Sequence, residues 1–146
     1  DTRGLCYDVS AGYESYRDVG LVDIAADAAH ERALEVMQEL LSVVRELRDS
    51  GPTEDELAKA KARHRWQLEA LLDDPSEMAD FYGAGELSGT SKSLAERRAR
   101  VEAVSRADVI QAASRVFSAT SLSAVAVGML SKKTESAMAR LISSFD

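Results

Sequence analysis

The chain has 146 residues, of which 45% are hydrophobic, and a net charge of −7. This length predicts a single domain spanning residues 1–146, with enough apolar residues for a core. The negative charge argues against nucleic acid and anionic lipid as partners. Because no apolar run is long enough to span a membrane, we expect a soluble protein, either cytoplasmic or periplasmic. The single cysteine excludes an internal disulfide and a multi-cysteine metal cage.

The first stretch of the chain predicts a β-hairpin. Residues 5–13 alternate between apolar and polar, which is typical of a half-buried strand, and residues 19–26 alternate again. The polar run 14–18 between them is suited to a turn. The apolar side of the two predicted strands carries Leu5, Tyr7, Val9, Ala11, Tyr13, Val22, Ile24 and Ala26. Since the first strand begins so close to residue 1, we expect a further segment before it.

Helices dominate the remainder of the chain. Asp27 is expected to cap a helix over 28–48 that lies on the sheet, and Thr53 with Glu56 to form a capping box for the next helix. Helical periodicity and turn residues place the helices at 28–48, 54–72, 76–87, 94–104, 106–117 and 133–145, with a third strand at 122–127. The pattern predicts an α+β fold, an antiparallel-rich sheet with helices packed on one face.

Neither histidine suggests a zinc site. A catalytic zinc motif needs two imidazoles on one helical face with a carboxylate nearby. His30 has Glu31 beside it but no second histidine in reach, and His64 lies on the apolar face of its helix. We therefore expect no metal ligands in this chain, with His30 solvated and His64 structural.

Other polar groups have simple structural explanations. The carboxylates of Asp73 and Asp74 stand at a helix end, before Pro75, where capping or solvation accounts for them. The arginines 97, 98 and 100 are interpreted as a solvated helix face, with an anion site as the alternative. Cys6 is expected to be a small buried residue and not a reactive thiol.

Four segments, in order, resemble one protein family. The stretch RGLCYDVSAGYESYRDVGL is similar to the family's RGLAYSV…YESYRDTGL, and GPTEDELAKAK to its GVTEEELERAK. The third segment, which begins with the sequence DPS, resembles a family helix that is followed by a Gly-bearing turn. The fourth, VEAVSRADVIQAASRVFSATSLSAVAVG, resembles the family's helix that leads into its last strand and glycine. The family is the insulinase and pitrilysin family of zinc metallopeptidases, peptidase M16, and the resemblance is to its carboxy-terminal, non-zinc domain.

The resemblance implies a site residue and a partner. In family members, repeated α+β domains face one another around a closed chamber, and the amino-terminal domain carries the zinc motif HxxEH. Tyr7 falls on the family tyrosine that donates a hydrogen bond to the scissile carbonyl as it becomes an oxyanion. The family's partner arginine would precede Asp1, and its role is not transferred to Arg3. No cofactor is implied in this chain, while zinc is expected in a partner domain or subunit.

Two functional hypotheses follow from the resemblance. The chain is the latter part of a non-zinc domain, inactive alone, that holds a peptide substrate as an extended strand and places Tyr7 near the scissile bond. Alternatively, it is a catalytically silent scaffold or partner subunit of the same family. The three predicted strands leave an open sheet edge, so an interaction module that forms a homodimer through this edge is the third possibility.

Overall fold

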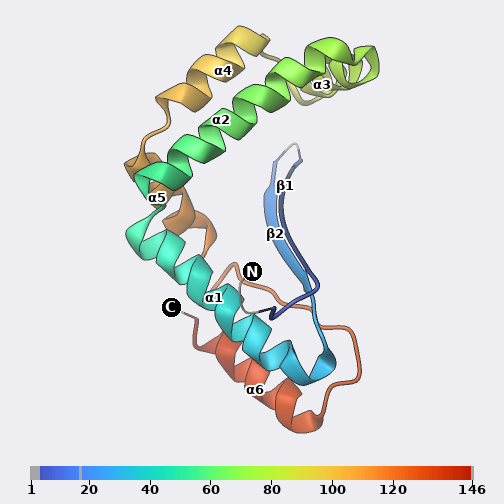
Figure 1. Ribbon diagram of the computed structural model, residues 1–146, viewed down its shortest axis with the longest axis vertical. Helices are drawn as coiled ribbons and strands as arrows, with labels where there is room; N and C mark the ends of the chain where they lie inside the picture. The colour runs from blue at the N-terminus through green and yellow to red at the C-terminus, as the bar shows by residue number, and fades with distance from the viewer. Residues whose placement is uncertain (1–3, 17, 146) are drawn as a thin grey trace. The chain divides into compact units, whose positions relative to one another are not determined.

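The computed structural model describes residues 4–16 and 18–145, and it confirms an α+β fold (Figure 1). Arg3, and Arg17 in the predicted turn, lie outside the described residues. The chain divides into two compact units, one built from the hairpin, the first long helix and the carboxy-terminal segment from residue 110, and the other mainly from Gly51–Val109. The single domain predicted for residues 1–146 stays a prediction.

The hairpin forms with the pairing that the alternation predicts. Strand β1 (Asp8–Ser15) pairs antiparallel with β2 (Gly20–Asp27). The register places Val9 opposite Ala26, Ala11 opposite Ile24 and Tyr13 opposite Val22. Because directly opposite residues share a face of the sheet, the apolar residues of both strands lie on one side. In the described part of the chain, the sheet contains these two strands alone.

The strand predicted at 122–127 does not form. This segment is extended between α5 (Arg106–Val116) and α6 (Lys132–Ser143), but it has no strand assignment and pairs with neither β1 nor β2 in the described chain. Val125 is 88% exposed and Val127 96% exposed. A strand needs a neighbour to take up its backbone hydrogen bonds, so alternation alone is insufficient here.

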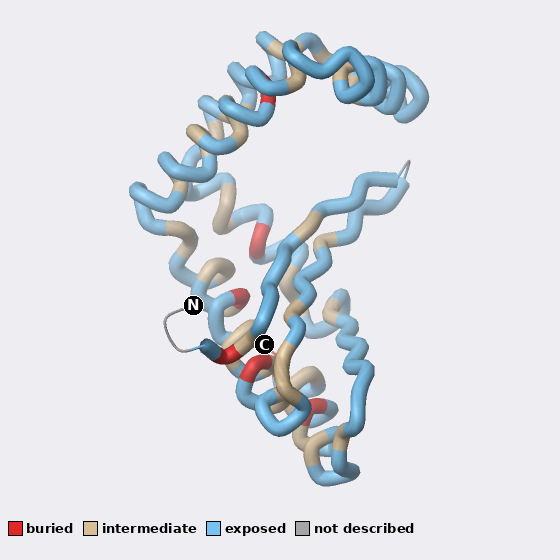
Figure 2. The backbone as a smooth tube through the Cα atoms, turned by 45° about the vertical axis from the view of Figure 1, so that its right-hand side comes forward, coloured by how far each residue is buried: buried red, intermediate tan, exposed pale blue. Residues whose placement is uncertain are grey.

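The first unit has its core between two helices. A short 3-10 helix, η1 (His30–Arg32), leads into α1 (Ala33–Ser50), which packs against α6. Leu41, Val44 and Phe145 are buried together there (red in Figure 2), surrounded by the partly buried Met37, Phe117, Leu122, Leu141 and Ile142. The expectation that the first helix lies on the sheet is wrong, because its apolar stripe is used against α6 and the chain end.

Asp27 does not cap this helix. It is the last residue of β2, and the residue before η1, Ala29, makes no side-chain capping bond. The carbonyl of Asp27 instead accepts the Tyr7 N–H at 2.6 Å. The strand therefore continues one residue further than predicted, and the helix begins later.

The second unit consists of capped helices. They are α2 (Glu54–Ala70), the 3-10 turn η2 (Leu71–Asp73), α3 (Pro75–Ser88) and α4 (Leu94–Ala103). The predicted capping box of Thr53 and Glu56 is confirmed, and Asp74 caps α3 with Pro75 in its first turn. The Lys61 ammonium donates to the Glu102 carbonyl at 2.9 Å, joining α2 to the end of α4. No helix in the described ranges is both long enough and apolar enough to cross a membrane.

Candidate functional site

Tyr7 lies in the open, immediately before β1. Its side chain is 84% exposed, whereas Leu5, two residues earlier, is 7% exposed. Val9 is 54% exposed, so neither Tyr7 nor Val9 is covered as Leu5 is, although the alternation places all three on one side of the strand. The bond from the Tyr7 N–H to Asp27 anchors the backbone. The phenol is thus held at the start of an accessible strand.

The apolar face of the hairpin is largely uncovered. Tyr13 is 69% exposed and Ile24 38% exposed, while Val22 and Ala26 are half-buried. Figure 2 shows most of the hairpin in the exposed colour. An apolar sheet face of this kind is typical of a surface that another element covers. Among the described residues, the hairpin therefore has a largely uncovered apolar face and no strand paired to its other edges.

The opposite face of the hairpin is acidic. Asp8 lies directly opposite Asp27, and Gly12 lies opposite Asp23. The Asp23 carboxylate extends across the sheet over Gly12, because a Cβ placed on Gly12 would lie 2.6 Å from Asp23 Oδ1. The absence of a side chain at Gly12 thus lets a β2 carboxylate reach β1. Like charges directly opposite one another are unfavourable, so this face favours a cation from outside the hairpin.

Tyr13 covers the second glycine of the hairpin. A Cβ on Gly20 would lie 3.0 Å from the Tyr13 hydroxyl oxygen and 3.2 Å from its Cε2 atom. The ring therefore lies diagonally over Gly20, in the manner by which aromatic residues compensate for glycine in a sheet. This contact places the Tyr13 ring at the turn end of the hairpin.

The residues that the structure describes do not fit a zinc site. Within residues 4–16 and 18–145, no three His, Cys, Asp or Glu side chains converge in a way that could hold a metal ion. The exposed His30 has its Nε2 atom 3.2 Å from Glu31 Oε1. His64 is half-buried in α2, and its Nε2 atom is buried without a hydrogen-bond partner.

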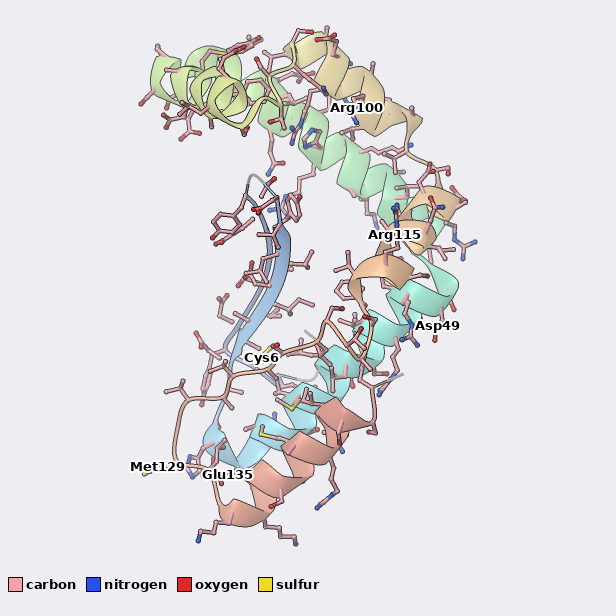
Figure 3. All side chains as sticks on the ribbon, turned by 180° about the vertical axis from the view of Figure 1, so that it is seen from behind. Cys6, Asp49, Arg100, Arg115, Met129 and Glu135 are labelled. Carbon is pink, nitrogen blue, oxygen red and sulfur yellow. The ribbon has the colours of Figure 1, made fainter. Side chains whose placement is uncertain are left out.

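The other sequence candidates are accounted for locally. Asp74 accepts from the Ser76 and Glu77 N–H groups as the cap of α3. The arginines 97, 98 and 100 of α4 are all exposed (Arg100 is labelled in Figure 3). The Nη1 atom of Arg98 lies 3.9 Å from Glu69 Oε1. Cys6 is half-buried and reduced. We find no convergence of these groups.

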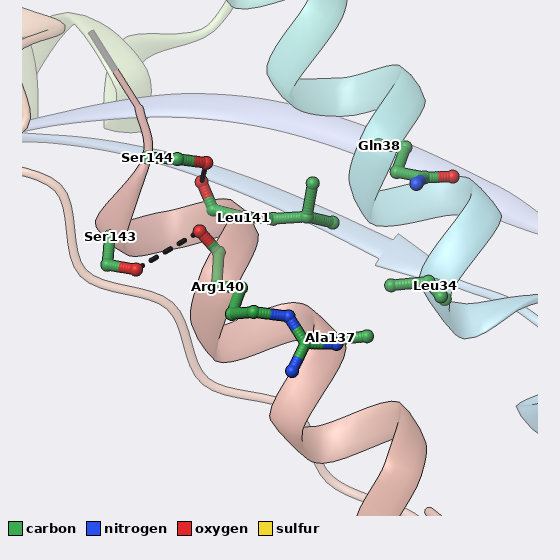
Figure 4. Close-up of a pocket in the computed structure, with 7 residues that line it drawn as sticks. All are labelled: Leu34, Gln38, Ala137, Arg140, Leu141, Ser143 and Ser144. Atoms are coloured by element: carbon green, nitrogen blue, oxygen red, sulfur yellow. Dashed lines mark hydrogen bonds between the residues drawn. The ribbon is translucent and has the colours of Figure 1, made fainter.

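Two open grooves flank α6 in the first unit. The first, of about 520 Å³, is lined by Leu34, Gln38, Ala137, Arg140, Leu141, Ser143 and Ser144 (Figure 4). Its serines are engaged locally, because Ser143 donates to the Arg140 carbonyl and Ser144 to the Leu141 carbonyl. The second groove, of about 560 Å³, lies under the extended segment before α6 and is mostly apolar. Neither collects the groups needed for catalysis.

The shifted carboxyl groups are structural. Hydrogen bonds from Thr53 lower the pKa of Glu56, and those from Ser93 and Ser105 lower the pKa of Glu96 and Asp108. The Arg48 guanidinium, at 2.7 Å, likewise lowers the pKa of Asp49, chiefly by its hydrogen bond. All four groups are helix-end carboxylates outside the hairpin, so the candidate site rests on geometry and exposure.

Part of the chain is similar to known proteins. Residues 1–63 match the family model for the Peptidase M16 inactive domain. The chain is 29% identical over 119 residues, or 81% of its length, to proteins named uncharacterized zinc protease from Mycobacterium bovis and from two strains of Mycobacterium tuberculosis. The chain spans about a quarter (27%) of the length of these relatives.

The matched residues 1–63 contain the whole hairpin, α1 and the first turns of α2, and they include Tyr7. Residues 1–63 are therefore similar to the Peptidase M16 inactive domain, and most of the chain is similar to proteins named as zinc proteases.

Proposed function

We propose that this chain is the substrate-holding half of a zinc metalloendopeptidase and is inactive without its zinc-bearing partner domain. The partner supplies the metal and the cleaving chemistry. This chain supplies a strand edge for the peptide and the Tyr7 phenol. The observation that carries the proposal is the 84% exposure of Tyr7 at the start of a strand that pairs on one side only within the described residues.

The free edge of β1 suits an extended peptide. In the part of the chain that the structure describes, β1 has a hydrogen-bonded neighbour on one side only, β2. A peptide added along the other side gains main-chain hydrogen bonds whatever its sequence. Tyr7, which directly precedes Asp8 of β1, then lies beside the peptide backbone.

The role of Tyr7 is to donate a hydrogen bond. The phenol O–H donates to the carbonyl oxygen of the peptide bond that is cleaved, and this bond strengthens as negative charge develops on that oxygen. The exposure of Tyr7 supports this role, because a phenol sealed in a core has no route to a substrate. Only a donor that is better matched to the transition state than to the substrate raises the rate.

Replacing Tyr7 by Phe in the full-length protein tests the proposal. We expect kcat for a peptide substrate to fall about 100-fold, as for loss of one oxyanion donor, with KM little changed. Tyr82→Phe, on α3 and 38% exposed, is the matched control and should retain full activity. An unchanged kcat in Tyr7→Phe would remove Tyr7 from catalysis and favour the silent scaffold.

A second copy of the chain is the competing occupant of the edge. Two hairpins could pair edge to edge, and such a dimer would block the peptide. Sedimentation of the full-length protein distinguishes the two occupants. A monomer that binds peptide supports the substrate role, whereas a dimer unaffected by excess peptide supports pairing of copies.

A further inference from the structure

We infer that Arg32 is a positioning residue for the Tyr7 phenol. This inference rests on the proposed function and adds the residue that restrains the segment carrying its hydrogen-bond donor. Arg32 is the last residue of η1, and its Nη1 atom donates to the Gly4 carbonyl at 2.7 Å. The bond therefore joins the start of the helical part of the first unit to the segment that leads into β1.

Three contacts of different kinds hold residues 4–7. The Gly4 carbonyl accepts from Arg32, the Leu5 side chain is 7% exposed, and the Tyr7 N–H donates to the Asp27 carbonyl at 2.6 Å. The Tyr7 side chain itself is 84% exposed, so packing does little to orient it. The direction of the phenol therefore depends on how firmly the backbone of this segment is held.

Gly4 is the residue of this segment that most needs a restraint. Its φ is +56°, in the left-handed region that glycine adopts at little steric cost. Glycine also has more backbone freedom to lose than any other residue. A hydrogen bond from a charged donor is stronger than one from a neutral donor, so the guanidinium of Arg32 is well suited to hold this carbonyl in place.

A purely structural role for Arg32 makes a different prediction. Arg32 is exposed, and its bond to Gly4 lies at the surface. Removing an exposed partner from a carbonyl that water can reach changes global stability little, because water takes its place. Arg32→Ala should therefore leave the free energy of unfolding close to that of the wild type and act on the segment alone.

The test is a double-mutant cycle in the full-length protein with a peptide substrate. Arg32→Ala should lower kcat about 10-fold with KM little changed, because a displaced donor stabilises the transition state less. In the Tyr7→Phe background the same change should lower kcat by less than about 2-fold, since the phenol that Arg32 positions is already absent. Arg115→Ala is the matched control, an exposed arginine on α5 in the same unit (Figure 3), and should leave kcat unchanged in both backgrounds.

Amide hydrogen exchange of the same variants measures the segment without relying on activity. Arg32→Ala should make the Tyr7 N–H, which is bonded to the Asp27 carbonyl, exchange several-fold faster. The amides of Leu41 and Val44, in the buried core, should keep their wild-type rates and so show that the unit remains folded. An unchanged Tyr7 rate would contradict a restraint by Arg32.

Gly4→Val perturbs the same segment by a second route. A Cβ on Gly4 would meet no atom within 4 Å, so the change acts chiefly through the backbone, because a β-branched residue disfavours a positive φ. It should lower kcat and speed exchange of the Tyr7 N–H, as Arg32→Ala does. A wild-type kcat in Gly4→Val would mean that the conformation of this segment does not control the phenol.

The failure of this inference is distinguishable from that of the proposed function. A wild-type kcat in Arg32→Ala, or an equal loss of kcat in both backgrounds, would overturn the role of Arg32. The proposed function stands in either case if Tyr7→Phe alone lowers kcat. An unchanged kcat in Tyr7→Phe instead rejects the proposed function, and the role of Arg32 with it.

Discussion

The guanidinium carbon of Arg45 lies 4.8 Å from the centre of the Phe145 ring, and that of Arg48 lies 5.4 Å away. Phe145 is fully buried, and Arg45 Nη2 also donates to the Ser144 carbonyl at 3.5 Å. Arg45 and Arg48, on successive turns of α1, thus contact the residues that follow α6. Cation–π contacts of this kind contribute about 0.5–1 kcal/mol each when exposed. This small core supports the unit from which the hairpin extends.

Replacing Phe145 by Ala should destabilise the first unit. A buried Phe replaced by Ala costs about 3–5 kcal/mol, because apolar contacts are lost and a cavity remains. Arg45→Ala removes a cation and leaves the ring in place, so it should cost only about 1 kcal/mol. Urea denaturation followed by circular dichroism gives both values, and hydrogen exchange should show the loss in α1 and α6. Equal costs for the two variants would contradict a core centred on Phe145.

The sequence predicts the hairpin strands and most helix starts well, because nearby residues determine these features. Period-2 alternation identifies both strands of the hairpin, and the observed register places their apolar residues on one face. The Thr53 and Glu56 signature locates the start of α2 to the residue. Each of these features is decided by residues within a few positions of one another.

Features that depend on contacts between residues far apart in the chain are not predicted from the sequence. Residues 122–127 alternate like a strand, but a strand also requires a partner, and none is found in the described residues. Tyr7 has the same periodicity as Leu5, yet only Leu5 is covered. The position of Asp23 over Gly12 depends on register, although a glycine inside a predicted strand was a usable sign of close approach.

Two glycines of α3 should respond in opposite ways to the same substitution. A Cβ on Gly83 would meet no other atom within 4 Å, whereas one on Gly85 would lie 3.0 Å from the Ser91 Cα atom. Gly83→Ala should therefore stabilise the protein by about 0.5–1 kcal/mol through helix propensity. Gly85→Ala should destabilise it, because backbone at Ser91 must move. Thermal unfolding of the two variants measures the difference, and a stabilising Gly85→Ala would rule out the close approach.

The capping box at Thr53 should contribute measurably to stability. The Thr53 hydroxyl accepts the Glu56 N–H at 3.2 Å, and Glu56 Oε2 accepts the Thr53 N–H at 2.8 Å. Thr53→Ala should cost about 0.5–2 kcal/mol, because it leaves helix-end groups without partners. Ser136→Ala is the matched control, since that hydroxyl donates to the Lys132 carbonyl inside α6. We expect the control to change the free energy of unfolding by much less, and the reverse order would argue against the box.

Acid should destabilise the chain through these same helix starts. In the folded protein the pKa values of Glu56, Glu96 and Asp108 are lowered by hydrogen bonds from their capping residues. A carboxyl whose pKa falls on folding stabilises the folded state above its unfolded pKa of about 4. That contribution disappears as the pH drops through the lower, folded pKa. The free energy of unfolding should thus begin to decline as the pH approaches the unfolded pKa of about 4 from above. It should continue to decline until the pH is below the lower, folded pKa values.

Removing the capping hydroxyls identifies the source of this pH dependence. The triple change Thr53→Ala, Ser93→Ala and Ser105→Ala removes the side-chain bonds that help to lower the three pKa values. The stability of this variant, measured by urea denaturation from pH 7 to pH 3, should fall less steeply with acid than that of the wild type. Ser136→Ala should keep the wild-type slope. An unchanged slope in the triple variant would assign the acid sensitivity to other groups, because the linkage requires the folded pKa values to rise when their donors are lost.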